Sequence, residues 1–417
     1  MSELCQRMTI GRNLLHVKLF RSTLGKKEAV MVLIKEVETY SPRPEGTVDI
    51  LCGGQTILAM GKNLCAGRFP EMTVLDGKGL LAVPGFIDSH VHFLGGGGEG
   101  GYTTRAPEIR LTDLTMAGVT TAVGCLGTDG FTRSLQSLVA KSCALDREGI
   151  STFLYTGSYQ VPPRTLFKTI EEDLLMIEKI IGVGEIAISD HRSSQPTLEE
   201  LKKIASSARV GGMLSGKAGI VNIHVGGGKE GLGPLFDLTA GSDIPADQFL
   251  PTHINRSHKL AAQGKEWALQ GGFVDLTASA SPTSEESLRP ARLFKEHFSE
   301  KNLSSRVTYS SDGQGSIPRF DEAGHFTGLG VGSCLSLLEE FRYSVLSLGL
   351  PLEEALLPLT SNPARILHLR DKGEIRPGAH ADLLLFSRSD LELRTVIARG
   401  VMAVSDGTPL IRGMFEV

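Results

Sequence analysis

Beyond residue 80 the chain alternates between short apolar runs and longer amphipathic runs, and this alternation restricts its fold more than any other pattern. The short runs are rich in β-branched and other apolar residues and have the length of single strands. There are eight of them, at residues 81–88, 120–125, 152–156, 185–189, 220–225, 249–252, 273–277 and 306–310. Eight strands alternating with helices predict an α/β fold, a parallel (β/α)8 barrel of the TIM type.

The amphipathic runs between the strands are predicted to be helices and include 133–148, 170–181, 198–209 and 256–270. Two more helical runs, 335–347 and 352–369, follow the last strand and would complete the outer layer. A barrel of this kind needs about 250 residues, so a chain of 417 residues has room for a second domain. We expect residues 81–372 to form the barrel domain.

The two ends of the chain consist of short strands and turns, in contrast to the alternating strands and helices of the predicted barrel. Neither end has enough strand to make a sandwich alone, so residues 1–80 and 373–417 are predicted to pair as one small β domain. Its expected strands are 30–36, 48–52, 55–59, 72–76, 381–386, 393–398 and 401–405.

Composition excludes several classes of partner. The net charge of −4 gives no reason to expect nucleic acid or an anionic membrane as a partner. No apolar run is long enough for a membrane span, and the first residues lack the basic start of a secretory signal. Six scattered cysteines without a Cys-x-x-Cys motif are typical of reduced thiols, so we expect a cytoplasmic protein.

The most informative short segment is residues 85–92, Gly-Phe-Ile-Asp-Ser-His-Val-His. Side chains two residues apart in a strand point to the same side, so His90 and His92 would converge on one point. Two neutral imidazoles at the end of a buried strand can form half of a metal site. A bare His-x-His pair is nonetheless more often structural, so the interpretation depends on the rest of the chain.

Further candidate ligands follow because catalytic side chains of such barrels lie at the C-terminal ends of the strands. The full set is His90, His92, Glu185, His224, His253 and Asp312. Four imidazoles and two carboxylates are too many for one tetrahedral ion and suit two divalent ions that share a bridging carboxylate. Zinc is the metal expected from so many imidazoles.

Several segments together carry a resemblance to a known family. They are 85–92, 95–99 (Gly-Gly-Gly-Gly-Glu), 126–129 (Leu-Gly-Thr-Asp), 188–192 (Ile-Ser-Asp-His-Arg), 250–256 (Leu-Pro-Thr-His-Ile-Asn-Arg), 310–316 (Ser-Ser-Asp-Gly-Gln-Gly-Ser), 373–378 and 381–383. This set resembles the amidohydrolase superfamily and, within it, the isoaspartyl dipeptidases. The resemblance implies binuclear metal-dependent hydrolysis of β-aspartyl dipeptides to aspartate and an amino acid, by a homo-oligomer.

The same resemblance assigns roles to individual residues. Glu99 would bind the substrate ammonium, and Arg192 and Arg256 would bind its two carboxylates. Asp312 would transfer the proton from the attacking water to the leaving amine, and Tyr159 would donate to the developing oxyanion. The remaining substrate contacts would come from Gly97, Gly98, Thr128 and Ser316. His191 is expected to be structural.

One position departs from the family pattern, which normally bridges the metals with a carboxylated lysine on the fourth strand. Alignment backwards from residues 189–192 places Glu185 there, with Gly184 as an apparent one-residue insertion, while Lys179 lies six residues upstream. A glutamate supplies a bridging carboxylate directly, without CO₂. The alternative is that Glu185 lies outside the ligand set and that the metal site is altered or mononuclear.

Two other functions stay open at this point. Another amidohydrolase activity, on a cyclic amide or as an aminohydrolase, would not need two arginines and an acid in one pocket. A metal-free scaffold of the same fold would have lost ligands, whereas here only the lysine has changed.

Overall fold

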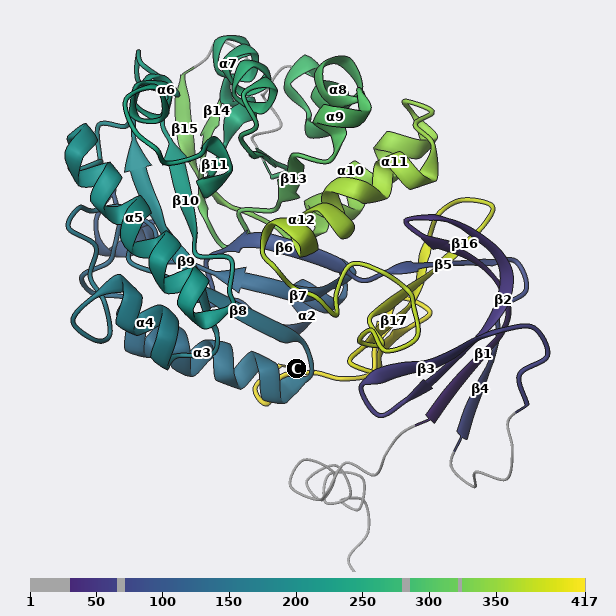
Figure 1. The fold of residues 1–417 in the computed structure, drawn as a ribbon. Helices are drawn as coiled ribbons and strands as arrows, with labels where there is room; N and C mark the ends of the chain where they lie inside the picture. Colours follow the sequence, from purple (N-terminus) through teal and green to yellow (C-terminus); the bar gives the residue numbers. More distant parts are fainter. Residues whose placement is uncertain (1–30, 66–71, 280–285, 322–324, 417) are drawn as a thin grey trace, which may run out of the picture.

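The computed structural model describes residues 31–65, 72–279, 286–321 and 325–416 (Figure 1). The first 30 residues, with Val30 of a predicted strand, lie outside the described residues. The described chain forms a barrel of alternating strands and helices, with a β-sheet from both ends of the chain beside it (Figure 1).

The barrel begins with a six-stranded parallel sheet whose strands follow each other in chain order. Strand β12 (Val274–Thr277) pairs in parallel with β13 (Val307–Ser310), β12 packs against β11, and β13 packs against β6, so eight strands complete the ring. The six strands of the sheet are β6 (Phe86–Val91), β7 (Val119–Gly124), β8 (Ser151–Thr156), β9 (Ile180–Ile188), β10 (Ile220–Val225) and β11 (Phe249–Thr252). The predicted (β/α)8 barrel is confirmed. Its strands read as continuous apolar runs because both of their faces are buried.

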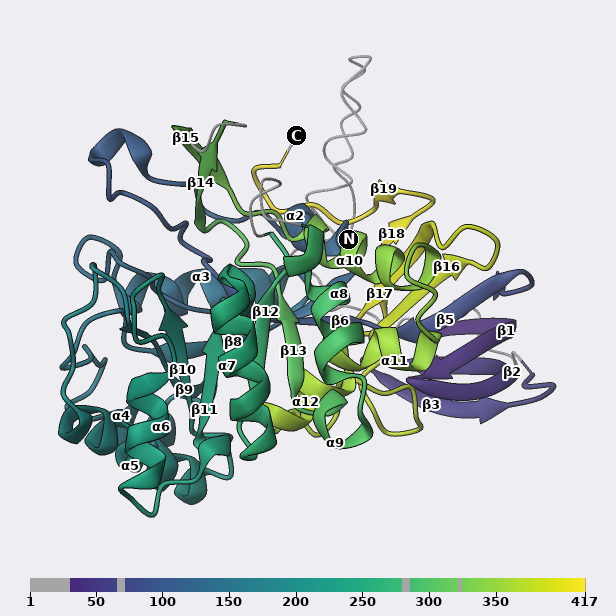
Figure 2. The same ribbon diagram turned by 90° about the horizontal axis from the view of Figure 1, so that it is seen from above.

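The helices cover the outside of these strands, as Figure 2 shows from above. The longest, α5, begins with a capping box between Thr197 and Glu200 and ends at Gly216 in the left-handed conformation. The barrel helices are α2 (Leu111–Thr115), α3 (Leu135–Glu148), α4 (Ile170–Met176), α5 (Leu198–Ser215), α6 (Gly233–Ala240), α7 (His258–Leu269), α8 (Pro290–Leu293), α9 (Lys301–Ser304), α10 (Leu335–Leu346), α11 (Leu352–Leu356) and α12 (Ser361–Ile366). Among the described residues, no helix combines the length and the apolar character that crossing a membrane requires.

Both ends of the chain contribute to one nine-stranded sheet, in which β5 pairs with β1 on one side and with β16 on the other. The strands from both ends therefore share a hydrophobic cluster that includes Val32, Ile34, Leu383 and Ile397. The strands are β1 (Met31–Ser41), β2 (Arg43–Gly53), β3 (Thr56–Gly61), β4 (Met72–Asp76), β5 (Leu80–Pro84), β16 (Leu383–Ser387), β17 (Leu393–Ala398), β18 (Val401–Ser405) and β19 (Thr408–Pro409).

Several predicted bounds differ from those of the structure, and three regions differ most. The run 81–88 is two strands, because β5 ends at Pro84 in the terminal sheet and β6 starts a new sheet at Phe86. The run 352–369 is broken into α11, a 3-10 turn at Leu357–Leu359 and α12, since Pro358 and Pro363 lack the N–H that would bond to the preceding turn and each lies in the first turn of a new segment.

The third error lies at residues 170–189. The helix ends at Met176 and β9 begins at Ile180, whereas a helix to 181 and a strand from 185 were expected. Gly182 and Gly184 lie within this strand and allow close packing, since a Cβ at Gly182 would lie 2.4 Å from the carbonyl oxygen of Ile220. The hairpin of β14 (Ser316–Phe320) and β15 (Phe326–Val331) was not predicted.

Candidate active site

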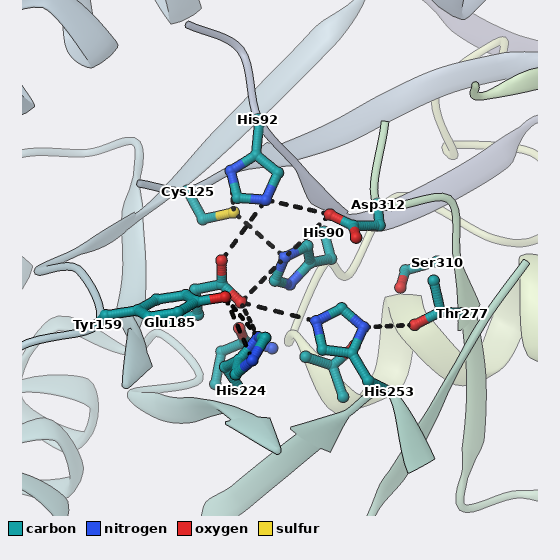
Figure 3. A network of polar contacts seen from close by, with 12 residues as sticks. His90, His92, Cys125, Tyr159, Glu185, His224, His253, Thr277, Ser310 and Asp312 are labelled. Carbon is teal, nitrogen blue, oxygen red and sulfur yellow. Dashed lines mark hydrogen bonds and ion pairs between the residues drawn. The ribbon is translucent and has the colours of Figure 1, made fainter. Parts of the chain in front are cut away.

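The C-terminal ends of the barrel strands bring the predicted metal ligands into one buried group (Figure 3). They come from five strands of the ring. His90 lies on β6 and His92 directly after it, Glu185 on β9, His224 on β10, His253 after β11 and Asp312 after β13.

Glu185 lies between two sets of histidines. On one side its Oε2 is 3.3 Å from Nε2 of His90 and its Oε1 is 3.5 Å from Nε2 of His92. On the other side Oε2 is 3.3 Å from Nδ1 of His224 and 3.9 Å from Nε2 of His253. One carboxylate therefore faces donor atoms of both sets, which is the position that a bridging ligand takes.

A bulge in β9 accompanies this placement. Val183 pairs with Val221 and Ile186 with Ile223, so two residues of β9, Gly184 and Glu185, stand opposite the one residue Asn222. Gly184 has φ of 151°, and a Cβ on it would lie 2.7 Å from the carbonyl oxygen of Asn222, so glycine is required here. The inserted residue inferred from the sequence is thus a glycine bulge beside the acid.

Lys179 is remote from this group, because it precedes β9 and its six-residue separation from Glu185 spans about 20 Å of extended strand. Its ammonium donates to the carboxylate of Asp146 and, at 3.1 Å, to the backbone carbonyl of Thr152. Lys179 therefore does not reach the position between the two histidine sets, and Glu185 is the residue that occupies it.

Hydrogen bonds from outside the group orient two of the imidazoles. His224 Nε2 lies 3.0 Å from Oδ2 of Asp190, and His253 Nδ1 lies 2.7 Å from Oγ1 of Thr277. Such partners fix which ring nitrogen faces a metal and strengthen it as a ligand. The nitrogens left facing Glu185 are Nδ1 of His224 and Nε2 of His253.

The charge states suit a cation site. Burial opposes ionisation of Glu185, but the imidazoles of His90, His224 and His253 outweigh it and hold its pKa well below the ordinary value. Burial likewise opposes ionisation of Asp312, yet His92 beside it lowers its pKa to about 2. Both acids are therefore ionised at neutral pH.

Two neighbours are neutral. Burial lowers the pKa of His253 to about 3, so its imidazole is unprotonated and free to bind a metal. Burial, together with the charge of Glu185, raises the pKa of Tyr159 well above its ordinary value, so its hydroxyl keeps its proton. That hydroxyl lies 2.8 Å from Nδ1 of His224.

The residues present fit a divalent cation. Among the described residues, neither oxygen of Glu185 nor Oδ1 of Asp312 has a hydrogen-bond partner, although these atoms are buried. Leaving buried anionic oxygens unpaired is costly unless a cation neutralises them. Histidine, carboxylate and, nearby, the thiol of Cys125 form two candidate sets that share Glu185.

A cavity of about 540 Å³ adjoins this group and is lined by five of its members as well as by the predicted substrate residues. Two predicted residues are not on its wall: His90 is fully buried, and Gly98 lies against Arg105. The substrate residues that line it are Gly97, Glu99, Thr128, Tyr159, Arg192, Arg256 and Ser316.

Glu99 and Arg192 are in contact within this cavity. Nη1 of Arg192 donates to Oε1 of Glu99 at 3.0 Å, and the Thr128 hydroxyl donates to the same oxygen at 2.9 Å. Asp190 holds the other edge of the guanidinium through two hydrogen bonds of 2.9 and 2.8 Å. A carboxylate and a guanidinium cation, the latter held in place by Asp190, therefore lie side by side on the cavity wall.

Sequence reasoning missed three residues around the site. Asp190 supports His224 and Arg192, and the buried Arg133 donates to the backbone carbonyls of Leu94 and of Gly96 and Gly97 in the glycine loop. Cys125 follows β7 with its Sγ 3.5 Å from Nε2 of His90. The rule that functional side chains end strands would have found Cys125, had it been applied to cysteine. His191 has a side chain that is 90% exposed, at the rim of the cavity.

Comparison with known proteins identifies the protein family to which this chain belongs. Residues 260–403 match the model of the amidohydrolase family. The crystal structure of the beta-aspartyl dipeptidase from Fervidobacterium islandicum AW-1, in complex with beta-Asp-Leu dipeptide, is 46% identical with a TM-score of 0.85. That match covers 92% of this chain and 98% of the other. The chain belongs to the amidohydrolase family, whose members are metal-dependent hydrolases. A second structure of the Fervidobacterium islandicum beta-aspartyl dipeptidase is 45% identical with a TM-score of 0.83, and that match covers 91% of this chain and 98% of the other.

More distant relatives have other activities. Adenine deaminase 2 of Carboxydothermus hydrogenoformans is 25% identical over 94% of this chain, but the chain spans only 60% of that protein. A deacetylase of Brucella anthropi is 25% identical over 90% of this chain and 88% of its own length. The family resemblance inferred from the sequence is thus confirmed, whereas substrate choice has to be argued from the cavity.

Proposed function

We propose that this protein is a binuclear metallo-dipeptidase that hydrolyses β-aspartyl (isoaspartyl) dipeptides to aspartate and an amino acid. The observation that carries the proposal is the charge pattern of one cavity: Glu99, Arg192 and Arg256 line it together with the metal-binding group. The 46% identity to a beta-aspartyl dipeptidase solved with beta-Asp-Leu supports the same substrate class.

The cavity matches the charges of such a substrate. Its aspartyl residue carries an ammonium and a carboxylate on one carbon atom, and Glu99 and Arg192 stand 3.0 Å apart to receive them. The leaving amino acid carries a second carboxylate, for which Arg256 supplies a second guanidinium on the same wall. An α-aspartyl dipeptide would present these charges at other distances from the scissile bond.

The metal ions would be held by two sets of residues that share Glu185. We assign His90, His92 and Asp312 to one ion and His224 and His253 to the other, and we expect zinc. A divalent ion bound there would supply Lewis acidity toward the side-chain amide carbonyl and would lower the pKa of water toward about 7.

The chain's own residues would then act as follows. Asp312, ionised at neutral pH, accepts the proton of the attacking water and delivers it to the leaving amine. Tyr159 keeps its proton and donates a hydrogen bond to the oxyanion that develops on the carbonyl. Arg192, fixed by Asp190, orients the aspartyl carboxylate so that the scissile carbon faces the water.

The experiment is a substrate panel on purified, zinc-loaded enzyme: β-Asp-Leu, α-Asp-Leu, an N-acetyl amino acid, a hydantoin and adenine. We expect turnover of β-Asp-Leu at least 100-fold above every other compound, because hydrogen bonds to charged groups contribute about 1.5–3 kcal/mol each and every other compound lacks at least one of these charge matches. Equal turnover of the two aspartyl isomers would contradict the pocket, and preferential turnover of adenine or of the acetyl compound would favour the activities of the distant relatives.

Two further expectations belong to this proposal. We expect a cytoplasmic enzyme, for which the five described cysteines, all free thiols, are suitable. We also expect a homo-oligomer, which light scattering of the purified protein would test.

A further inference from the structure

A buried arginine lies behind the cavity wall and has no part in the function proposed so far. Arg133 is 5% exposed, directly precedes the N-cap of α3, and is not among the residues that line the cavity. Its guanidinium faces two loops that do contribute to the cavity wall. These are the glycine loop (residues 94–106), which follows β6, and the loop of residues 127–132, which follows β7.

Every N–H group of this guanidinium has an acceptor. One N–H donates to Oδ2 of Asp129, in the loop after β7, at 3.1 Å. The other four donate at 2.9–3.3 Å to backbone carbonyls of the glycine loop, those of Leu94, Gly96, Gly97 and Ala106. Since an arginine has five N–H donors in one plane, its full hydrogen-bonding capacity is spent on holding these two loops.

The glycines of the first loop cannot anchor it through side chains. Gly95, Gly97 and Gly98 have φ of 76°, 72° and 107°, conformations that glycine adopts readily. Arg133 fixes this part of the loop from behind, because it binds carbonyls on both arms of the loop. Glu99 comes two residues after Gly97, so the fixed carbonyls set the place where the Glu99 side chain enters the cavity.

The second loop carries the other residue that contacts Glu99. Asp129 accepts from Arg133 and, at 2.6 Å, from Nη1 of Arg105 in the glycine loop, so ion pairs join the two loops. The neighbouring Thr128 donates to Oε1 of Glu99 at 2.9 Å. One buried cation therefore holds both segments whose side chains meet at this carboxylate.

We propose that Arg133 is a positioning residue for recognition of the substrate ammonium, an inference that rests on the proposed function. It fixes Glu99 and Thr128 at the place where the ammonium binds. Because Arg133 lies behind the wall, it acts through these two residues and does not touch the substrate. It thereby determines how strongly a β-aspartyl dipeptide is preferred over a compound of the same shape that lacks the ammonium.

Lysine at this position would keep the charge but not the geometry. Its ammonium has three donors around one nitrogen atom, whereas the guanidinium spreads five donors over a plane. Arg133→Lys therefore retains a cation between the loops and loses at least two of the five hydrogen bonds. The direction of the Glu99 side chain is then no longer fixed, and a misplacement of about 1 Å can lower a rate by about 100-fold.

The experiment compares two compounds that differ only in the ammonium, β-Asp-Leu and N-succinyl-Leu. We would measure kcat and KM of zinc-loaded wild type, Arg133→Lys and Arg399→Lys. Arg399 is the matched control, since its guanidinium also donates to backbone carbonyls, at 3.0 and 3.4 Å, but follows β17 and does not line the cavity.

We expect wild type and Arg399→Lys to prefer β-Asp-Leu by about 10–100-fold in kcat/KM, because the ammonium forms a hydrogen bond between charged groups. In Arg133→Lys this preference should fall by about tenfold, mainly through a higher KM for β-Asp-Leu, with zinc content unchanged. A general folding defect would lower kcat/KM for both compounds alike. An unchanged preference in Arg133→Lys would therefore overturn the inference.

A double-mutant cycle tests whether the effect passes through Glu99. In Glu99→Gln, adding Arg133→Lys should not change the preference further, because the carboxylate to be positioned is gone. Additive effects would contradict the inference. If Arg133→Lys does not fold, Asp129→Asn replaces it, since it removes the charge that joins the loops; the preference should fall by about threefold, and no fall would again overturn the inference.

The outcomes separate this inference from the proposed function. Turnover of β-Asp-Leu with a preference that is insensitive to Arg133 refutes the inference alone. If wild type does not hydrolyse β-Asp-Leu, the proposed function is refuted, and calorimetric binding of the two compounds to the same zinc-loaded proteins gives the preference instead. Equal binding of both compounds by wild type would then overturn the inference as well.

Discussion

Replacing Glu185 with glutamine tests whether a glutamate holds the two ions together. The substitution keeps the size of the side chain and removes a buried negative charge that lies 3.3–3.9 Å from all four imidazoles. Two unit charges about 4 Å apart interact by about 4 kcal/mol at an effective dielectric constant of about 20. Since 1.4 kcal/mol is a factor of ten, we expect metal affinity to fall by about 1,000-fold.

The assay is equilibrium dialysis of apo-protein against zinc, with metal analysis of the retained protein. Lys179→Met is the matched control: it removes the ammonium that donates to Asp146, which lowers the stability of the fold but leaves the metal content unchanged. Wild type should regain full activity with zinc in CO₂-depleted buffer. A bicarbonate requirement, a carboxylated lysine found by mass spectrometry, or unchanged zinc affinity in Glu185→Gln would refute the reasoning.

Three other changes have defined outcomes. Arg256→Met should lower kcat/KM for β-Asp-Leu by about 10–100-fold, because the substrate carboxylate loses a hydrogen bond to a charged group, which contributes about 1.5–3 kcal/mol; an unchanged kcat/KM in steady-state kinetics would exclude that contact. Thr277→Val removes the hydroxyl that lies 2.7 Å from Nδ1 of His253. In zinc titrations the variant should bind one ion about 10–100-fold more weakly, while the melting temperature of the apo-protein stays nearly constant. Burial opposes ionisation of Asp129, but hydrogen bonds from Thr132 lower its pKa from 3.8 to about 2. Its contribution to stability is thus present above about pH 4 and lost as the pH falls toward 2. Asp129→Asn should lower the free energy of unfolding by about 1 kcal/mol at pH 6 and by much less at pH 2, in denaturant titrations; an equal loss at both pH values would contradict the assignment.

The barrel could be predicted because its strands are buried on both faces. Runs such as β10 and β11 are mostly apolar and buried from end to end, and they were placed at their observed bounds. The ligands could be located by one geometric rule, that functional side chains end parallel strands. His90, His224 and Asp312 all follow it. The rule needs only chain order and strand ends, both of which are local properties of the sequence.

What escaped prediction depends on contacts between distant segments. The break between β5 and β6 follows from the pairing of β5 with β16, which no local pattern reveals. Asp190 supports His224 only because β9 and β10 are neighbours. The close approach of the β10 backbone to Gly182 and Gly184 likewise depends on the pairing of β9 with β10.

The pairing of β5 with β16 also sets the order in which the molecule can be completed during synthesis. Val83 pairs with Leu384, about 300 residues later in the chain, and only Gly85 separates β5 from the strand that carries His90. Until the ribosome has released the segment around Leu384, one edge of β5 has no partner, and the strand that begins the barrel is anchored on one side only. A nascent chain therefore exposes a sheet edge that invites association with other chains. The metal centre can become fully anchored only after β16 has been synthesised, so a chain that stopped before Leu383 would have every candidate ligand present and its first strand unsecured.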